Sequence, residues 1–543
     1  MKSETLTKIG SIIFLIGIIF VLISWYHSYP IHLSPINDLT FFQFYPLLWP
    51  GIVFSLIGLF LIAFYSKNRL VIAACSSTLL LLLNVDAFFF SYISSSDSGA
   101  VAGMFQVFQK TSINSNIIPY FEFPTYFSLN EIMRQIVGVD EKGVALISFA
   151  LYGALLGLFI YLFFVNLKKF YYNSLIPFLL VIIYFIGMFS FLNYQWAPQT
   201  LALVYFFLLL SLSSYLFFNE QKSKWNFLII FVFIPFVFSH AFMPVIFLSF
   251  FGILTIKKKY LAKIFLVIFF IYITVTVFYA SSYLPLYINT FRQSITGFNK
   301  EYTTAISSSF REPESLLSRF IIFSNSITVP MIWIFSGIGT ILLFLKKRIN
   351  FVLIAIGLAG SIYLAVGLFY SVLGLRAAQI LFICISIGFM FFISKWKKLT
   401  ISFIVIILIL AVFLPMRIEY NNTHFQIDEE ANACSFLANK IRNVTHPDVA
   451  IGQVNFGYFT NIYSYLKNGY SFEFARRPGS QGFLDVFNKS IKKNDFVLYS
   501  TNMGKEIIRF VMTSEQLNTT LVRIKSNNKI FDSGSTFILN GIH

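Results

Sequence analysis

Few residues of this chain could carry out chemistry, and each of them interrupts an apolar sequence. Asp97 lies in Ser94-Ser-Ser-Asp-Ser-Gly99, a few residues after an apolar segment that ends near residue 90. A carboxylate there could act as a general base on an acceptor hydroxyl group, or help to hold a divalent cation such as Mg²⁺ or Mn²⁺. The alternative is structural, because Asp is a good N-cap and helical apolar spacing begins at Ser98.

Three other ionisable residues lie within apolar segments or at their ends. Asp86 falls inside one, where a charge costs about 2.5–3.5 kcal/mol and needs a partner or water. Arg376 opens another, and its guanidinium group matches phosphate oxygens, although it would equally suit a side chain that reaches lipid headgroups. His240, between Ser239 and Pro244, is either a ligand-binding histidine or a packing histidine.

The elements that position these residues are apolar helices. The 543 residues are 57% hydrophobic and 12% charged, and the mean hydropathy is +0.76, which excludes ordinary soluble packing. Apolar runs of about 20 residues recur along the chain, and these are too long for the strands of a membrane β-barrel. The sequence therefore predicts a polytopic α-helical membrane protein embedded in a lipid bilayer.

The formal charge of +17 could indicate a nucleic-acid partner, but its distribution points to a membrane. Residues 416–543 hold 14 Lys and Arg against 11 Asp and Glu, so about +14 belongs to residues 1–415. That excess lies in short loops such as 67–69, 168–169, 257–263, 346–348 and 395–398. This is the positive-inside pattern, so we expect no nucleic acid and a cytoplasmic N-terminus.

Counting apolar segments gives about thirteen transmembrane helices, which start inside and finish outside. Residues 226–256 are predicted to form two short helices that break near Ser239-His240 and Pro244, because lysines at both ends belong in the cytoplasm. The first apolar segment follows Lys2 and Lys8 without a small-residue cleavage site, so we read it as a retained span. Residues 1–69 would be an N-terminal helix pair and residues 70–415 the main transmembrane domain.

Two outer loops, 91–142 and 284–325, are long enough to be functional. In the first, residues 98–109 and 126–137 have helical apolar spacing and are predicted to lie along the outer surface, with Glu122 between them as a candidate substrate-binding residue. The second holds a mixed set of charges, including Arg292 and Arg319. It is either a lid over a substrate or solvated surface.

Residues 416–543 have the composition of a small soluble domain, predicted to be α/β and to lie outside the cell membrane. Strands are expected at 448–454, 495–500, 520–525, 529–531 and 535–539. All four N-x-[S/T] sequons fall in this domain, which agrees with an extracytoplasmic location, although Asn, Ser and Thr are also simply common there.

The order of parts resembles the GT-C superfamily of membrane glycosyltransferases, which use polyprenyl-phosphate-linked sugar donors, and in particular its prokaryotic and archaeal members. The similarity rests on a span followed by a long outer loop with an early acidic residue and two surface helices, then short-looped spans and a soluble C-terminal domain. Ser239-His240-Ala-Phe-Met-Pro244 is similar to a His-plus-Pro junction of that superfamily. The resemblance covers roughly residues 70–400.

The resemblance implies a multi-pass enzyme that transfers a sugar on the outer face with inversion. It implies that Asp97 is the catalytic base and that Arg376 contacts the donor phosphate. The remaining candidates for substrate binding are His240, Asp86, Glu122, Arg292 and Arg319. The two-acid motif of many members is absent, so no metal ligands are assigned and a divalent cation remains an open possibility.

Two other function classes compete with this interpretation. A lipid or glycolipid transporter would carry paired ionisable residues deep in the spans and two similar halves, and the sequence shows neither. A membrane-anchored assembly or binding protein would work through its outer domain, and Asp97 would then be dispensable.

Overall fold

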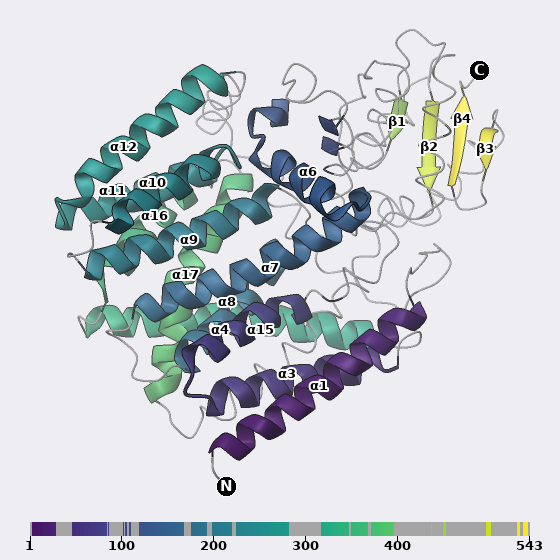
Figure 1. Cartoon of the computed structure of the whole chain (residues 1–543), viewed down its shortest axis with the longest axis horizontal. Helices are drawn as coiled ribbons and strands as arrows, with labels where there is room; N and C mark the ends of the chain where they lie inside the picture. Colours follow the sequence, from purple (N-terminus) through teal and green to yellow (C-terminus); the bar gives the residue numbers. More distant parts are fainter. Residues whose placement is uncertain are drawn as a thin grey trace.

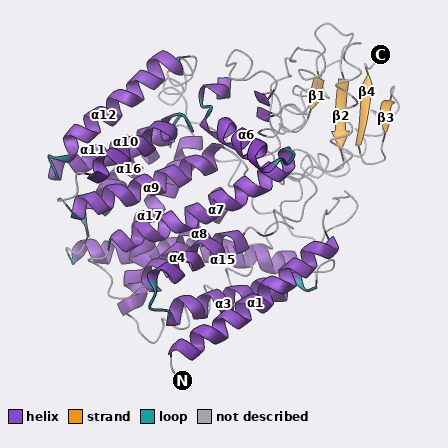
Figure 2. Cartoon of the chain, in the orientation of Figure 1, coloured by secondary structure: helices purple, strands orange, loops and turns teal. Residues whose placement is uncertain are grey.

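The structure is a computed structural model of the whole chain, and it is dominated by a bundle of α-helices (Figures 1 and 2). It describes residues 3–28, 46–83, 85, 101, 104–105, 108–109, 119–167, 175–192, 198–219, 224–281, 316–346, 349–367, 371–395, 436, 449–451, 496–500, 529–532 and 536–540. The apolar segment at 400–415, which is one of the predicted spans, lies outside the described residues.

The described helices follow the apolar segments of the sequence. They are α1 (Ser3–Ser28), α3 (Leu48–Tyr65), α4 (Arg69–Leu83), α6 (Thr125–Val137), α7 (Glu141–Asn166), α8 (Leu175–Leu192), α9 (Pro198–Phe218), α10 (Lys224–Val237), α11 (Met243–Lys257), α12 (Leu261–Thr274), α15 (Leu316–Leu345), α16 (Phe351–Gly367) and α17 (Ser371–Lys395). A short 3₁₀ helix, η2 (Pro119–Glu122), precedes α6, and a π-helix, η4 (Val275–Tyr279), extends α12.

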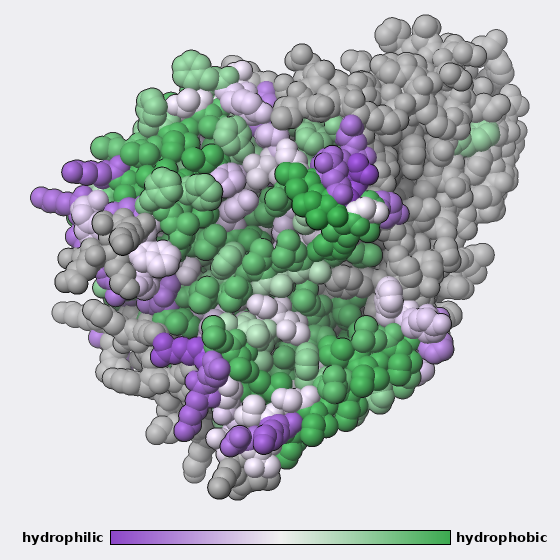
Figure 3. Space-filling view, viewed as in Figure 1, coloured by the Kyte–Doolittle hydropathy of each residue, from purple (hydrophilic) through white to green (hydrophobic). Residues whose placement is uncertain are grey.

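Five helices in the described part of the chain are long and apolar enough to cross a membrane: Ser3–His27, Leu48–Tyr65, Gly143–Asn166, Pro198–Phe218 and Leu261–Tyr279. Other apolar helices are shorter, at 10–17 residues. Figure 3 shows apolar side chains covering the middle of the visible face, with hydrophilic side chains toward its two ends. This distribution is compatible with a lipid bilayer around the middle of the bundle.

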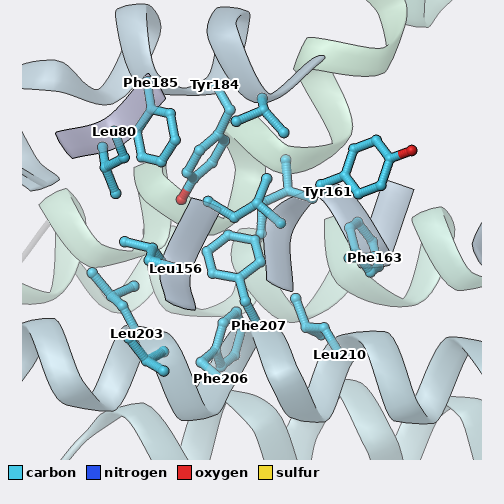
Figure 4. Close-up of a cluster of buried hydrophobic side chains, with 14 of the residues drawn as sticks. Leu80, Leu156, Tyr161, Phe163, Tyr184, Phe185, Leu203, Phe206, Phe207 and Leu210 are labelled. Carbon is cyan, nitrogen blue, oxygen red and sulfur yellow. The ribbon is translucent and has the colours of Figure 1, made fainter. Parts of the chain in front are cut away.

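The interior of the bundle is built from aromatic and branched side chains. Figure 4 shows Tyr184, Phe207 and Leu156 meeting in one buried cluster. The ring centroids of Tyr184 and Phe207 are 5.4 Å apart, and the Tyr184 hydroxyl donates to the backbone oxygen of Gln379 at 3.3 Å. A buried hydroxyl group keeps a hydrogen bond in this way, which avoids the cost of an unmet donor.

Glycines let several helices approach closely. A Cβ at Gly58 of α3 would lie 2.5 Å from the backbone nitrogen of Phe14 in α1, and a Cβ at Gly339 of α15 would overlap the backbone of Gly388 in α17. Gly360 similarly meets Leu381. Small residues thus let these helices pack backbone to backbone, whereas Gly337, two residues before Gly339, has nothing within 4 Å.

One predicted boundary is wrong. The loop expected to run to residue 325 gives way to α15 at Leu316, and α15 continues for 30 residues to Leu345. Arg319 therefore lies in the first turns of a helix rather than in a loop. The apolar pattern fails to reveal this start because residues 316–326 mix polar and apolar side chains.

Four short strands form one sheet in the order β1-β2-β4-β3. They are β1 (Val449–Ile451), β2 (Phe496–Ser500), β3 (Lys529–Asp532) and β4 (Thr536–Asn540). β1 and β2 are parallel, whereas β4 pairs antiparallel with both β2 and β3, with an irregularity between Lys529 and Phe531. These strands lie at four of the predicted positions.

Candidate functional site

A break between α10 and α11 forms the centre of the candidate site. α10 ends at Val237, the chain turns through residues 238–242, and α11 begins at Met243 with Pro244 in its first turn. These helix ends confirm the predicted break near Ser239-His240. Proline favours such a break because it lacks the backbone N–H that a continuous helix would need. Helices of 14 and 15 residues are about 21–23 Å long, less than the roughly 30 Å of a bilayer core.

Side chains of the break satisfy its own backbone. The Ser239 hydroxyl donates to the Phe236 carbonyl oxygen at 2.7 Å, and the Phe242 N–H donates to Nδ1 of His240 at 3.1 Å. His240 is 2% exposed. A neutral imidazole carries one proton, so a bond accepted at Nδ1 places that proton on Nε2. His240 thus has a structural contact and also holds an Nε2–H donor in a fixed orientation.

The segment before α6 packs onto this break. The Thr125 N–H donates to the Phe238 carbonyl oxygen at 3.2 Å. Phe123 is buried against Ala241 of the break and Ala280 at the end of η4. Non-helical backbone at membrane depth is tolerated where protein buries it. Three separate elements therefore meet at one point, which we call the junction (residues 119–125, 238–242 and 275–280).

Glu122 brings a carboxyl group into the junction. It is 4% exposed and lies near enough to the Tyr279 hydroxyl for an electrostatic interaction. Tyr279 in turn packs edge-on against Phe238, with ring centroids 5.1 Å apart. A Glu is rarely buried without a partner, and an ionisable residue beside apolar helices suggests a functional site. Tyr279 also ends a π-helix, an irregularity that is frequent at functional sites.

Buried tyrosine side chains of α6, α7 and α9 lie close together. The rings of Tyr126 in α6 and Tyr152 in α7 are 6.3 Å apart, and Tyr205 of α9 lies near Tyr152. Burial raises the pKa of Tyr126 well above its ordinary range. The Tyr152 hydroxyl has no hydrogen-bond partner in the described part of the chain.

Glu131 links α6 to the segment that precedes it. Its carboxylate accepts hydrogen bonds from Arg134 Nε and Nη2 at 2.9 and 2.8 Å, from Gln135 at 2.9 Å and from Gln109 at 3.0 Å. These bonds, led by those from Arg134, lower the pKa of Glu131 from its ordinary 4.5 to about 2 despite its partial burial. Gln109 belongs to the preceding part of the first loop, so Glu131 joins two segments of that loop.

Two of the predicted substrate-binding residues, Glu122 and His240, are brought to the same junction. Arg376 lies six residues into α17, which begins at Ser371 rather than at Arg376, and Arg319 lies in α15; the side chains of both are outside the described part. Asp97, Asp86 and Arg292 are outside the described residues altogether. The position of the proposed catalytic base therefore remains a prediction.

Sequence reasoning missed Tyr279, Phe238 and the buried tyrosines of α6, α7 and α9. Tyr279 looks like an ordinary aromatic residue at the end of an apolar segment, and no local pattern signals its proximity to a residue more than 150 positions earlier. The one available signal is indirect, because tyrosine keeps a polar hydroxyl group and needs a partner when it is buried.

Comparisons with known proteins do not identify a family for this chain. No protein-family model matches the chain, and no curated protein matches it significantly. Among the described residues, no three His, Cys, Asp or Glu side chains gather where they could hold a metal ion. The described part of the chain is thus a helical protein with several bilayer-compatible helices and one polar junction between them.

Proposed function

We propose that this chain is a membrane glycosyltransferase of GT-C-like architecture. It transfers a sugar from a polyprenyl-phosphate donor to an acceptor on the outer face, with inversion at the anomeric carbon. The proposal includes about thirteen spans, a cytoplasmic N-terminus and a C-terminal α/β domain outside the membrane, of which the four-stranded sheet would be part.

The observation that carries this proposal is that Glu122 and His240 are both buried at the junction, where their neighbours Phe123 and Ala241 pack together. The donor of such an enzyme is a lipid whose phosphate and sugar must leave water at the edge of the bilayer. A helix break that stops short of a full crossing offers polar groups at that depth. The first loop covers this break through Phe123 and the Thr125–Phe238 hydrogen bond.

The groups at the junction have chemistry that suits a sugar phosphate. The Nε2–H of His240 can donate to a phosphate or hydroxyl oxygen, and the Glu122 carboxylate can accept from sugar hydroxyl groups. Exchanging water for such fixed partners preserves the hydrogen bonds of the substrate while excluding competing hydrolysis. We assign both residues to substrate binding.

The reaction itself is assigned to Asp97. Its carboxylate takes the proton of the acceptor hydroxyl while that oxygen bonds to the anomeric carbon. The bond from this carbon to the phosphate oxygen breaks, and the electron pair leaves with the polyprenyl phosphate. The leaving group needs a cation rather than a proton, and Arg376 is the proposed source of that charge.

The proposal is tested by transfer of radiolabelled sugar from polyprenyl-phosphate donors in membranes that carry the full chain. We expect Asp97→Asn to lower the rate by about 10²–10⁴-fold, which is the usual contribution of a general base. Glu122→Gln is expected to raise the donor KM with a smaller change in kcat. Glu4→Gln makes the same chemical change at an exposed residue of α1 and serves as the matched control.

Undiminished transfer by Asp97→Asn would remove that residue from catalysis. No transfer by the wild type with any donor sugar would reject the glycosyltransferase proposal. Movement of a labelled lipid between the leaflets of vesicles that carry the wild type would then support a transporter. Accessibility of single cysteines introduced at residues 4 and 530 tests the two predicted sides of the membrane.

A further inference from the structure

A second polar site lies at the start of α16, near the turn that joins α11 to α12. Asn350 precedes the helix, and its side-chain oxygen accepts a hydrogen bond from the Val352 N–H at 2.8 Å. Its carbonyl oxygen accepts from the Ile354 N–H at 3.1 Å. Asn350 is therefore the N-cap of a 17-residue helix, whose N-terminus carries partial positive charge and further N–H donors.

The same side chain has an unused donor. Nδ2 of Asn350 has no hydrogen-bond partner among the residues that the structure describes, and Asn350 is only 9% exposed. A buried donor without an acceptor costs about 1–3 kcal/mol, and this cost disappears when an acceptor oxygen reaches it. The amide thus marks the helix end as a site that is completed by an anionic or neutral acceptor.

Two lysines supply positive charge beside this helix end. The Lys257 ammonium lies 5.2 Å from the ring centroid of Phe351, and the Lys258 ammonium lies 5.7 Å from that of Phe217. The two rings stack on each other, with centroids 6.0 Å apart and planes 11° apart. The cation–π contacts therefore hold both ammonium groups near the first residue of α16.

We propose that this cluster binds the phosphate of an anionic phospholipid. Helix N–H groups, an amide N–H and two ammonium groups are all donors, and together they match phosphate oxygens. No carboxylate forms an ion pair with Lys257 in the described part of the chain, so nothing there neutralises it. Basic groups between helix ends at one membrane surface are a recurrent way of binding acidic lipid headgroups.

The surface next to the cluster favours a lipid over a free phosphate. Ile354, Leu358 and Ile362 are four residues apart on α16, and their exposed fractions are 36%, 49% and 54%. They form an apolar stripe that starts one turn beyond Asn350 and runs down the helix. A phospholipid whose phosphate lies at the N-terminus can place an acyl chain along this stripe, which inorganic phosphate cannot do.

Binding requires a small movement at the surface. The Nδ2 atom of Asn350 is covered in the structure, so a phosphate oxygen reaches it only after neighbouring atoms shift. Lys257 is exposed, so its long side chain can turn toward a bound phosphate. The site lies on α16 and α11, away from the junction, so the inference does not depend on the proposed enzymatic activity.

The test uses the full chain in nanodiscs and measures binding of fluorescent phosphatidylglycerol and phosphatidylcholine. The wild type is expected to prefer phosphatidylglycerol. Replacing both lysines, Lys257→Gln with Lys258→Gln, should weaken that binding by about 30-fold. Asn350→Asp keeps the helix cap, because a carboxylate accepts the Val352 N–H equally well. It also removes the Nδ2 donor and adds a repelling charge, so we expect at least a tenfold loss with unchanged thermal unfolding.

Lys8→Gln is the matched control, because it removes one positive charge from the N-terminal helix and should leave binding unchanged. An equal loss in this control, or equal binding of the two lipids by the wild type, would overturn the proposal. Millimolar inorganic phosphate provides the last arm of the test. If it displaces phosphatidylglycerol completely, the site binds free phosphate and the lipid assignment is wrong; persistent lipid binding supports it.

Discussion

The Thr125 N–H donates to the Phe238 carbonyl oxygen at 3.2 Å, and this bond links the start of α6 to the end of α10. More than 100 residues separate the two partners in the chain. The bond occupies a carbonyl group that the helix break leaves without its intrahelical partner. The first loop and the break are therefore parts of one structure, and a change in either should be felt in the other.

Removing the aromatic ring of Phe123 should loosen this link. Phe123 is buried against Ala241 and Ala280, whose methyl groups are too short to fill the space that it would leave. Phe→Ala changes in packed sites cost about 3–5 kcal/mol. We expect Phe123→Ala to increase hydrogen exchange across residues 119–137 and 238–242, measured by mass spectrometry in detergent. Ile136→Ala, at an exposed position of α6, should change neither segment; equal protection in both variants would contradict this account.

The two ring nitrogens of His240 can be tested separately. An Asn at this position can still accept the Phe242 N–H through its side-chain oxygen, as Asn does in turns, but it lacks the imidazole Nε2–H. We expect His240→Asn to keep the wild-type melting temperature and to lower sugar transfer by about tenfold, which is the loss of one substrate hydrogen bond.

His240→Ala removes both ring nitrogens and should also lower the melting temperature of the purified protein. Full transfer activity in His240→Asn would show that the imidazole serves only to hold the turn between α10 and α11. Transfer is measured with the radiolabelled donor, and unfolding is followed by intrinsic fluorescence during heating.

The helices and the break at His240 could be predicted because both follow local rules. Apolar runs identify the bilayer-compatible helices, and Pro244 with flanking lysines identifies the break. The start of α15 could not be predicted, since residues 316–326 gain their helical state from context rather than from an apolar pattern. Helix propensity is a weak guide when packing decides the outcome.

The candidate site was predictable only in its separate parts. Glu122 and His240 each have a residue type that suggests chemistry, yet nothing in the sequence states that the segments around them touch. The two segments are held together by the packing of Phe123 against Ala241 and Ala280, which are far from it in the chain. Tyr279 could not be predicted as part of the site, because the nearby carboxylate of Glu122 comes from another element.

The pH dependence of α6 should follow the titration of Glu131. Its pKa in the folded protein is about 2, below the ordinary 4.5, so the ionised form is favoured by folding. The stabilisation is therefore complete above pH 4.5 and is lost as the pH falls toward 2. We expect carbon-13 NMR of labelled Glu131 to give a pKa near 2. The protection factors of the α6 amides, which correct for the slower intrinsic exchange at low pH, should fall below pH 4.

Glu131→Gln provides the control for this titration. A glutamine cannot ionise, so amide exchange in α6 should be faster than in the wild type at pH 7. In this variant the protection of α6 should also lose the change between pH 4.5 and 2 that the wild type shows. A wild-type pKa at the ordinary value would mean that the hydrogen bonds from Arg134, Gln135 and Gln109 do not form in solution.

Two glycines of α15 offer the most direct test of the helix packing. Gly339 faces α17, where a methyl group would overlap the backbone of Gly388, whereas Gly337 has nothing within 4 Å. Both residues are interior positions of one helix, so replacing either with alanine brings the same gain in helix propensity, about 1 kcal/mol. Gly339→Ala should nevertheless destabilise the protein by about 1–3 kcal/mol, because neither backbone can move away without losing contacts along the whole helix pair. Gly337→Ala should be neutral or slightly stabilising. The measurement is the midpoint of thermal unfolding of both variants in the same detergent, and equal midpoints would show that α15 and α17 do not approach through Gly339 and Gly388.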